Sequence, residues 1–195
     1  HDFMPLLKAR VGLPGSAPIP ERPEEPKVNA WSLSTWGKGL SQVGKWLNYA
    51  WHAIILDRET YRQIARDATM TAPALLITLV SQILQSLNSI ERFDIVNILL
   101  RYMVWFVGIL LLYFAGRILR GKADYTTTLR VAGFAQSAHI LELLGFIPVI
   151  GPLARIMGLI LTLLGIWMGT AQANELRGWR SILLPVVYIA TVVIT

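Results

Sequence analysis

Residues 126–176 read TTTLRVAGFAQSAHILELLGFIPVIGPLARIMGLILTLLGIWMGTAQANEL, and this stretch decides the fold. It holds two apolar runs, residues 129–147 and 153–173. Each is about 20 residues long, which at about 1.5 Å per residue spans the hydrocarbon core of a bilayer. The link between them, PVIGP, carries two prolines and a glycine, which end one helix and begin the next. The stretch therefore predicts two antiparallel membrane-spanning helices joined by a tight turn.

Small residues recur along the second of these helices at spacings of 4, 4, 3, 4 and 4, which places them on one face. They are Ala154, Gly158, Thr162, Gly165, Gly169 and Ala173. In lipid, small residues let helix backbones approach closely and so stabilise helix–helix contacts. One interpretation is packing within the chain, against the helix over residues 129–147. The other is an interaction surface for a partner subunit, centred on Gly158, Gly165 and Gly169.

The overall composition indicates a membrane protein. The chain has 195 residues, 54% of them hydrophobic, and its mean hydropathy of +0.50 is above that of soluble domains. It has no cysteine, which excludes disulfides and thiolate chemistry. The net charge of +6 fits membrane topology or attraction to anionic lipids. No basic run with interleaved aromatic residues indicates a nucleic-acid partner.

Residues 1–30 form a proline-rich arm of mixed charge without a long apolar run. Its prolines are Pro5, Pro14, Pro18, Pro20, Pro23 and Pro26. This composition favours an extended chain with no core of its own. We expect a partner protein to hold the arm, which would make the chain a subunit of a larger membrane assembly.

Residues 31–69 predict a helical segment at the membrane surface. Its apolar residues recur every 3 to 5 positions: Trp31, Trp36, Leu40, Val43, Leu47, Trp51 and Ile54. Because tryptophan favours the headgroup layer, this series is typical of an amphipathic helix lying on the membrane. A helix that docks on a partner subunit would show the same pattern, and the two roles are compatible. The charged segment DRETYRQIARDA, residues 57–68, follows as a short helix with Asp57 as its candidate N-cap.

Residues 70–195 contain five apolar runs, so we expect an all-α polytopic membrane protein with about five transmembrane helices. The runs cover residues 71–87, 95–118, 129–147, 153–173 and 181–195. Positive charges gather before the first run, between the second and third, and between the fourth and fifth. They are Arg58, Arg62, Arg66, Arg117, Arg120, Lys122, Arg130, Arg177 and Arg180. By the positive-inside rule the N-terminus is cytoplasmic and the C-terminus lies outside.

Three ionisable residues fall within the predicted spans at similar depth: Arg101, Glu142 and Arg155. A charge inside a membrane is costly, so each needs a stabilising neighbour. The simplest interpretation is that one or both arginines pair with Glu142 or extend toward the surface. The alternatives are a proton or ion relay between Glu142 and His139, one turn deeper, and contact with a partner protein.

His139 has a second interpretation as a pigment ligand, because an imidazole inside a membrane can bind haem iron or chlorophyll magnesium. A bis-histidine haem would need a second membrane histidine, and His52 lies in the interfacial segment. A single axial bond to a chlorophyll-type pigment is the option that remains. The sequence requires no cofactor, although bound lipid is expected. It has no Walker loop, GxSxG or HExxH, so no motif supports an enzyme.

Four segments of the chain carry a family resemblance. They are DRETYRQIARDA (57–68), LRVAGFAQSAHIL (129–141), IPVIGP (147–152) and ANELRGWRSILLPVV (173–187). Together they resemble the bacterial branch of the YIP (Ypt-interacting protein) domain family over about residues 57–195. His139 stands roughly where that family often has a proline, which puts a kink there in doubt. The resemblance implies a five-helix integral fold, here in a bacterial inner membrane; eukaryotic relatives bind small GTPases and act in vesicle transport.

Three functions follow from these observations. The first is a non-enzymatic accessory or scaffold subunit of a larger membrane complex, respiratory or photosynthetic, that docks through the arm, the tryptophan helix and the glycine face. The second is a small transporter or channel-like protein whose path would be lined by Gln136, His139 and Glu142. The third is a membrane-shaping or trafficking factor, which the family resemblance alone suggests.

Overall fold

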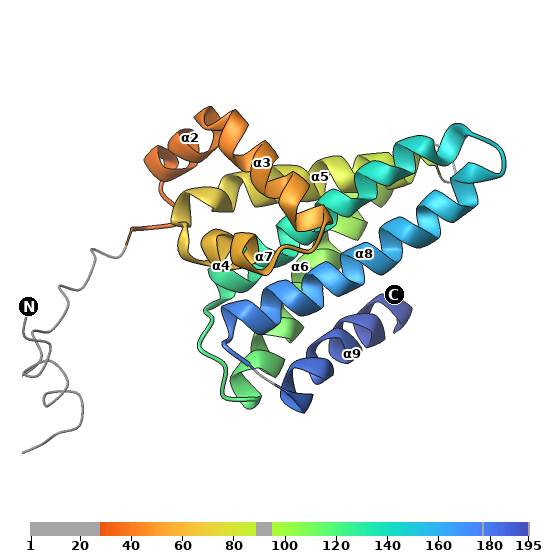
Figure 1. Ribbon diagram of the computed structural model, residues 1–195. Helices are drawn as coiled ribbons and strands as arrows, with labels where there is room; N and C mark the ends of the chain where they lie inside the picture. The colour runs from red at the N-terminus through yellow and green to blue at the C-terminus, as the bar shows by residue number, and fades with distance from the viewer. Residues whose placement is uncertain (1–27, 89–94, 177, 195) are drawn as a thin grey trace, which may run out of the picture.

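The computed structural model describes residues 28–88, 95–176 and 178–194, shown in colour in Figure 1. Over these residues the chain forms helices and turns, with no β-strand. The all-α prediction is therefore confirmed. Residues 1–27, almost the whole of the proline-rich arm, lie outside the described residues, so the expectation that a partner holds the arm stays a prediction.

The segment before the membrane helices differs from its prediction. The sequence favoured one amphipathic helix, but the chain forms α2 (Leu33–Ser41) and α3 (Val43–Ile54), with a break at Gln42. Gly37, Gly39 and Gly44 surround the break, and glycine is a poor helix former. Gly39 also packs so closely on the Thr69 carbonyl that no side chain fits there, which fixes α2 against the start of the first membrane helix.

The charged segment forms the predicted short helix, α4 (Arg58–Arg66), followed by one 3₁₀ turn, η1 (Ala68–Met70). The Asp57 carboxylate accepts hydrogen bonds from the backbone N–H groups of Glu59 at 3.2 Å and Thr60 at 3.1 Å. The N-cap prediction is confirmed. The hydrogen bond from the Thr60 hydroxyl is the main cause that holds the pKa of Asp57 below its usual range.

Among the described residues, three helices are long and apolar enough to cross a membrane: α5 (Thr71–Asn88), α6 (Ile95–Ile118) and α8 (Ile150–Ala173). Their apolar stretches, Ala68–Ser86, Ile95–Ile118 and Ile150–Ala173, have mean hydropathies of 1.3, 2.2 and 1.8. The last helix, α9 (Trp179–Ile194), has a shorter apolar stretch, Arg180–Ile189, and contains Pro185. The structure thus supports a polytopic helical membrane protein, with three candidate spans among the described residues rather than a confirmed five.

The expected third span is not one α-helix. The chain forms α7 (Tyr125–Ala135) and continues as an 11-residue 3₁₀ helix, η2 (Gln136–Phe146). Such a long 3₁₀ run is uncommon. Two side-chain hydroxyls donate hydrogen bonds to backbone carbonyls at the junction of α7 and η2. Ser137 donates to the Phe134 carbonyl at 2.7 Å, and Ser81 donates to the Gln136 carbonyl at 2.8 Å. These hydroxyls compete with the backbone N–H groups that would bond the same carbonyls in an α-helix. At about 1.5 and 2.0 Å per residue, α7 and η2 are together as long as a bilayer core is thick.

The α7–η2 segment and α8 lie side by side and antiparallel, joined by the sharp turn at the far end of the molecule (Figure 1). Val149 adopts φ 73°, and the Gly151 N–H donates to the Ile147 carbonyl at 2.8 Å. The predicted antiparallel pair and its turn are confirmed, although α8 begins at Ile150. The α5 helix packs on α7–η2, α6 packs on α9, and α4 crosses α7 and α8.

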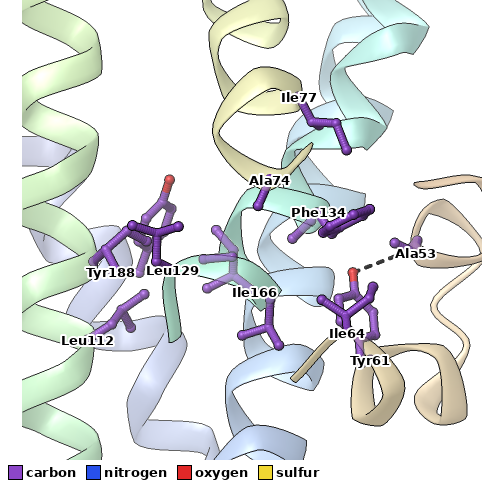
Figure 2. Packing of buried hydrophobic residues seen from close by; sticks show 14 of the residues in the cluster. Ala53, Tyr61, Ile64, Ala74, Ile77, Leu112, Leu129, Phe134, Ile166 and Tyr188 are labelled. Carbon is purple, nitrogen blue, oxygen red and sulfur yellow. Dashed lines mark hydrogen bonds between the residues drawn. The ribbon is translucent and has the colours of Figure 1, made fainter. Parts of the chain in front are cut away.

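The core lies in the half of the bundle nearest α4. Figure 2 shows Tyr61 and Ile64 of α4 beside Phe134 of α7 and Ile166 of α8, and each of these side chains is fully buried. Farther along, toward the turn at 147–149, α8 instead exposes a run of large apolar side chains: Leu153, Ile156, Met157, Leu159 and Ile160. The α6 helix exposes apolar residues along its full length, from Ile95 to Ile118. Burying such surfaces in lipid is what an integral membrane protein requires.

Candidate membrane interface and buried polar site

The first face of α3 is docked on the bundle. Trp46, Tyr49, Ala50 and Ala53 recur at helical spacing and pack on the core. The Ala50 carbonyl accepts a hydrogen bond from Ser137 of η2 at 3.0 Å, and the Ala53 carbonyl accepts one from Tyr61 of α4 at 3.2 Å. These contacts hold α3 rigidly beside the junction of α7 and η2.

The second face of α3 is apolar and exposed. Val43, Leu47 and Trp51 follow one another at intervals of four and are 48%, 51% and 62% exposed. On α2, Leu33 and Leu40 are also exposed. Large apolar side chains arranged in a stripe are a binding surface for lipid or for another protein.

The third face of α3 is polar and carries Lys45, Asn48 and His52. At about 100° per residue, the docked, apolar and polar faces are centred roughly 110–130° apart. One helix therefore carries a docked face, an exposed apolar face and a polar face. Such a helix suits a membrane–water boundary, and it suits equally a position between the bundle and a partner subunit.

The predicted tryptophan residues take different positions. Trp51 lies on the exposed apolar stripe and Trp31 is also exposed, whereas Trp36 is half-buried. The Trp36 indole N–H donates to the Ala30 carbonyl at 2.8 Å, and the rings of Trp31 and Trp36 lie 6.0 Å apart. The indoles of Trp31 and Trp51 are thus the ones available to the surroundings.

An ion pair ties α3 to the connection that leads into α5. The Lys45 Nζ lies 2.6 Å from Asp67 Oδ2. Burial acts to raise the pKa of Asp67, but hydrogen bonds from Lys45 and from the hydroxyl and N–H of Thr69 outweigh it and hold the pKa below its usual range. The hydrogen bond to Asp67 raises the pKa of Lys45 despite partial burial. Both groups are therefore charged at neutral pH.

The polar residues of η2 form a buried pair. His139 Nδ1 lies 2.6 Å from Glu142 Oε1, within one turn of η2, and each residue is 7% exposed. The pairing of Glu142 with Arg101 or Arg155, which the sequence favoured, stays a prediction. Arg101 lies half-buried on α6, and Arg155 is exposed near the start of α8. The interpretation of His139 as a pigment ligand stays a prediction.

Gln136 and its neighbours extend this polar region. The side-chain amide of Gln136 donates to the Tyr188 hydroxyl of α9 at 3.3 Å, and the Ser81 hydroxyl donates to the backbone carbonyl of Gln136. Gln136, like His139 and Glu142, is buried. These residues form a polar seam between helices, as expected of hydrogen-bonding groups in a membrane bundle. Across the described residues, no group of three histidine or acidic side chains is placed to hold a metal ion.

The glycine face of α8 points into the molecule. A Cβ on Gly165 would lie 2.5 Å from the Tyr61 hydroxyl oxygen, and one on Gly169 would lie 2.8 Å from the Tyr61 ring. A Cβ on Gly158 would lie 3.4 Å from the Ala138 carbonyl oxygen. The face therefore packs on α4, α7 and η2 within the chain, the first of the two interpretations drawn from its spacing.

Sequence reasoning missed two residues that organise this region. Tyr61 belongs to the charged segment 57–68, yet it is fully buried under α8; its spacing of three from Ile64 indicates an apolar face. Arg130 was counted as a loop charge, yet it is 5% exposed. Its guanidinium donates to the Ala65 carbonyl at 2.6 Å and the Thr127 hydroxyl at 2.9 Å, so it ties α7 to α4.

The three candidate spans and the helical fold of the described residues support an integral membrane protein, with the helix pair α2–α3 docked on its bundle. A sequence model of the Yip1 domain matches residues 51–195, and the chain belongs to the Yip1 domain family. The match begins near the end of α3, six residues before the segment that carries the resemblance in the sequence. The family is not known for enzymatic activity. No curated protein and no solved structure matches the chain.

Proposed function

We propose that this chain is a non-enzymatic scaffold, an accessory subunit that anchors a larger membrane protein complex to one leaflet of the bilayer. The observation that carries the proposal is the three-faced helix α3, which is held by the bundle and offers an apolar stripe of Val43, Leu47 and Trp51. The stripe rests in the lipid and the polar face meets water. Trp31, where the sequence of the proline-rich arm ends, then lies at the membrane surface, and the role of the arm in this proposal is to bind partner subunits.

The proposed orientation places α4 on the cytoplasmic side of a bacterial inner membrane. Arg58, Arg62 and Arg66 of α4 lie at the same end of the bundle as Lys122 and the connection between α8 and α9, because all of them line one cleft. The turn at residues 147–149 lies at the opposite end (Figure 1). This gathering of basic residues supports a cytoplasmic N-terminus and an external C-terminus.

The test of the subunit role is gentle detergent extraction from native membranes, followed by native-gel separation, mass spectrometry and an absorption spectrum. A scaffold migrates with its complex, and deletion of residues 1–27 releases it while the bundle stays folded. The matched control replaces Leu47 with glutamate, which weakens the lipid contact of α3 but keeps the arm. Migration of the intact chain as a single small species would contradict the proposal.

A second function, membrane shaping, is favoured by the same helix pair. Helices whose apolar stripe enters one leaflet expand that leaflet and sense or produce curvature. Reconstitution into vesicles of different diameter tests this role, with enrichment in small vesicles as the supporting result. Equal distribution over all diameters would contradict membrane shaping, and the scaffold would be the remaining function.

A further inference from the structure

An open cleft of about 1090 Å³ lies at the end of the bundle where α4, the segment around Lys122 and the connection from α8 to α9 meet. Arg58, Arg62 and Arg66 line one wall. Because they are spaced by four, they project from one face of α4, and all three are exposed. Lys122 completes a set of four cations around the cleft.

The carboxylates of the cleft already have partners. Asp124 caps α7 by accepting hydrogen bonds from the Thr127 N–H at 2.7 Å and the Thr126 hydroxyl at 3.0 Å. Glu175 Oε2 lies 2.6 Å from Lys122 Nζ. Outside the cleft, Glu59 pairs with Arg62 at 3.1 Å. These acids therefore neutralise Lys122 and Arg62.

Arg58 and Arg66 are the cations left over. Within the part of the chain that the structure describes, neither guanidinium has an ion pair or a side-chain hydrogen bond. Arg62 keeps a fixed position between them, since its Nε donates to Gln172 Oε1 at 3.0 Å. Each free guanidinium offers a planar set of donors that matches the oxygens of a phosphate group.

The cleft is amphiphilic as well as basic. Trp167, Met168 and Leu176 contribute apolar lining in addition to the arginines. A site lined by both cations and apolar side chains fits a molecule with a phosphate head and a hydrocarbon body. It lies at the end of the membrane helices, where lipid headgroups are found.

We propose that this cleft binds a phosphate-bearing anion through Arg58 and Arg66, the headgroup of an anionic phospholipid being the occupant whose shape its lining fits. The site is separate from the α2–α3 surface and is used whether or not the chain is a scaffold. A soluble phosphate compound shares the same headgroup chemistry, so the experiment must distinguish the two sources.

The experiment uses the purified full chain in detergent and measures binding by calorimetry. The probes are short-chain phosphatidylglycerol, short-chain phosphatidylcholine, glycerol 3-phosphate and inorganic phosphate. The variant Arg58→Gln/Arg66→Gln removes the two free guanidiniums. The matched control, Lys38→Gln/Arg117→Gln, removes the same charge from exposed positions outside the cleft, and thermal unfolding checks that both variants remain folded.

We expect phosphatidylglycerol to bind the native chain and the Arg58/Arg66 variant to lose at least about tenfold in affinity, because charge-assisted hydrogen bonds are lost. The Lys38/Arg117 control keeps its affinity. Binding of glycerol 3-phosphate or inorganic phosphate as tight as that of the lipid supports the anion site and assigns it to a soluble ligand. Equal losses in both variants, equal binding of phosphatidylcholine, or no binding of any anion overturns the proposal.

Discussion

The Tyr61 hydroxyl of α4 lies against the backbone of Gly165 on α8, so close that a Cβ on this glycine would be 2.5 Å from the hydroxyl oxygen. The same hydroxyl donates to the Ala53 carbonyl of α3 at 3.2 Å, the dashed line in Figure 2. One side chain therefore joins α3, α4 and α8. The glycine face of α8 leaves the space in which α4, a helix with many charged residues, packs on the bundle.

Replacing Gly165 with alanine should destabilise the protein by about 1–3 kcal/mol, because the new methyl group overlaps Tyr61 and comes within 3.0 Å of the Ala135 Cβ. Gly165→Leu should abolish assembly of the folded chain. The matched control is Gly37→Ala in α2, where a Cβ meets nothing within 4 Å. That change should be neutral or stabilising by up to about 1 kcal/mol. Thermal unfolding in detergent compares the variants; a Gly165→Leu protein as stable as the native one would contradict the packing.

A double-mutant cycle tests whether the hydroxyl itself is the obstacle. Tyr61→Phe alone should cost about 0.5–1.5 kcal/mol, because the hydrogen bond to Ala53 is lost. In the Tyr61→Phe background, Gly165→Ala should cost less than in the native chain, since the atom nearest the new Cβ has been removed. Strictly additive free energies of unfolding would show that Tyr61 and Gly165 do not interact.

The sequence predicted the helical class, the antiparallel pair and the turn at PVIGP because these depend on local rules: apolar length, and the positions of proline and glycine. It also predicted the Asp57 cap, which is set by two neighbouring backbone groups. It did not predict the 3₁₀ geometry of η2. That geometry depends on hydrogen bonds from the hydroxyls of Ser81 and Ser137 to backbone carbonyls. The Ser81 bond forms only when α5 packs beside η2, so a local sequence pattern does not indicate it.

The residue types of the candidate site could be predicted from the sequence, whereas the distances between their side chains could not. The sequence placed Glu142 among ionisable neighbours at similar depth, but the depth of a residue does not fix its direction. His139 contacts Glu142 because the tight 3₁₀ turn brings residues three apart onto one side. The basic cleft could not be predicted from the sequence either, because its walls come from segments more than fifty residues apart, around Arg58 and Lys122.

The Lys45–Asp67 pair predicts a pH dependence for the docking of α3. The pKa of Asp67 is held below its usual value of 3.8, so its contribution to stability is present above that pH and is lost as pH falls through the lowered pKa. The raised pKa of Lys45 keeps the pair intact up to at least pH 10.5. Since both side chains are partly exposed to solvent, the pair should contribute about 0.5–1 kcal/mol.

The measurement is thermal unfolding of the native chain and of Lys45→Gln at pH 7 and below pH 4. The native chain should be more stable than Lys45→Gln at pH 7, and this difference should shrink once the pH falls through the lowered pKa of Asp67. Lys122→Gln is the matched control, because its pair with Glu175 is largely exposed and should add little at either pH. A difference between native and Lys45→Gln proteins that is the same at both pH values would show that the ion pair does not hold α3.

The three faces of α3 predict an alternating pattern of solvent access that the absence of cysteine makes easy to measure. Single substitutions Leu47→Cys and Trp51→Cys, labelled with a nitroxide in vesicles, should be accessible to oxygen dissolved in lipid. Asn48→Cys and His52→Cys should be accessible to a water-soluble nickel complex. The four positions form two adjacent pairs, 47/48 and 51/52, so each pair controls for local mobility. Water access at all four would place α3 outside the bilayer and favour a protein partner for the apolar stripe.

The proposed topology predicts opposite exposure for two turns of the same chain. Lys122 and Val149 are both exposed, the first beside α4 and the second, 90% exposed, at the turn before α8. In intact bacterial cells, a membrane-impermeant maleimide should label Val149→Cys from outside and reach Lys122→Cys only after the inner membrane is opened. Neither change removes a core contact, so both variants should insert normally. Labelling of Lys122→Cys in intact cells, with Val149→Cys protected, would invert the topology and place the arm and the basic cleft outside the cytoplasm.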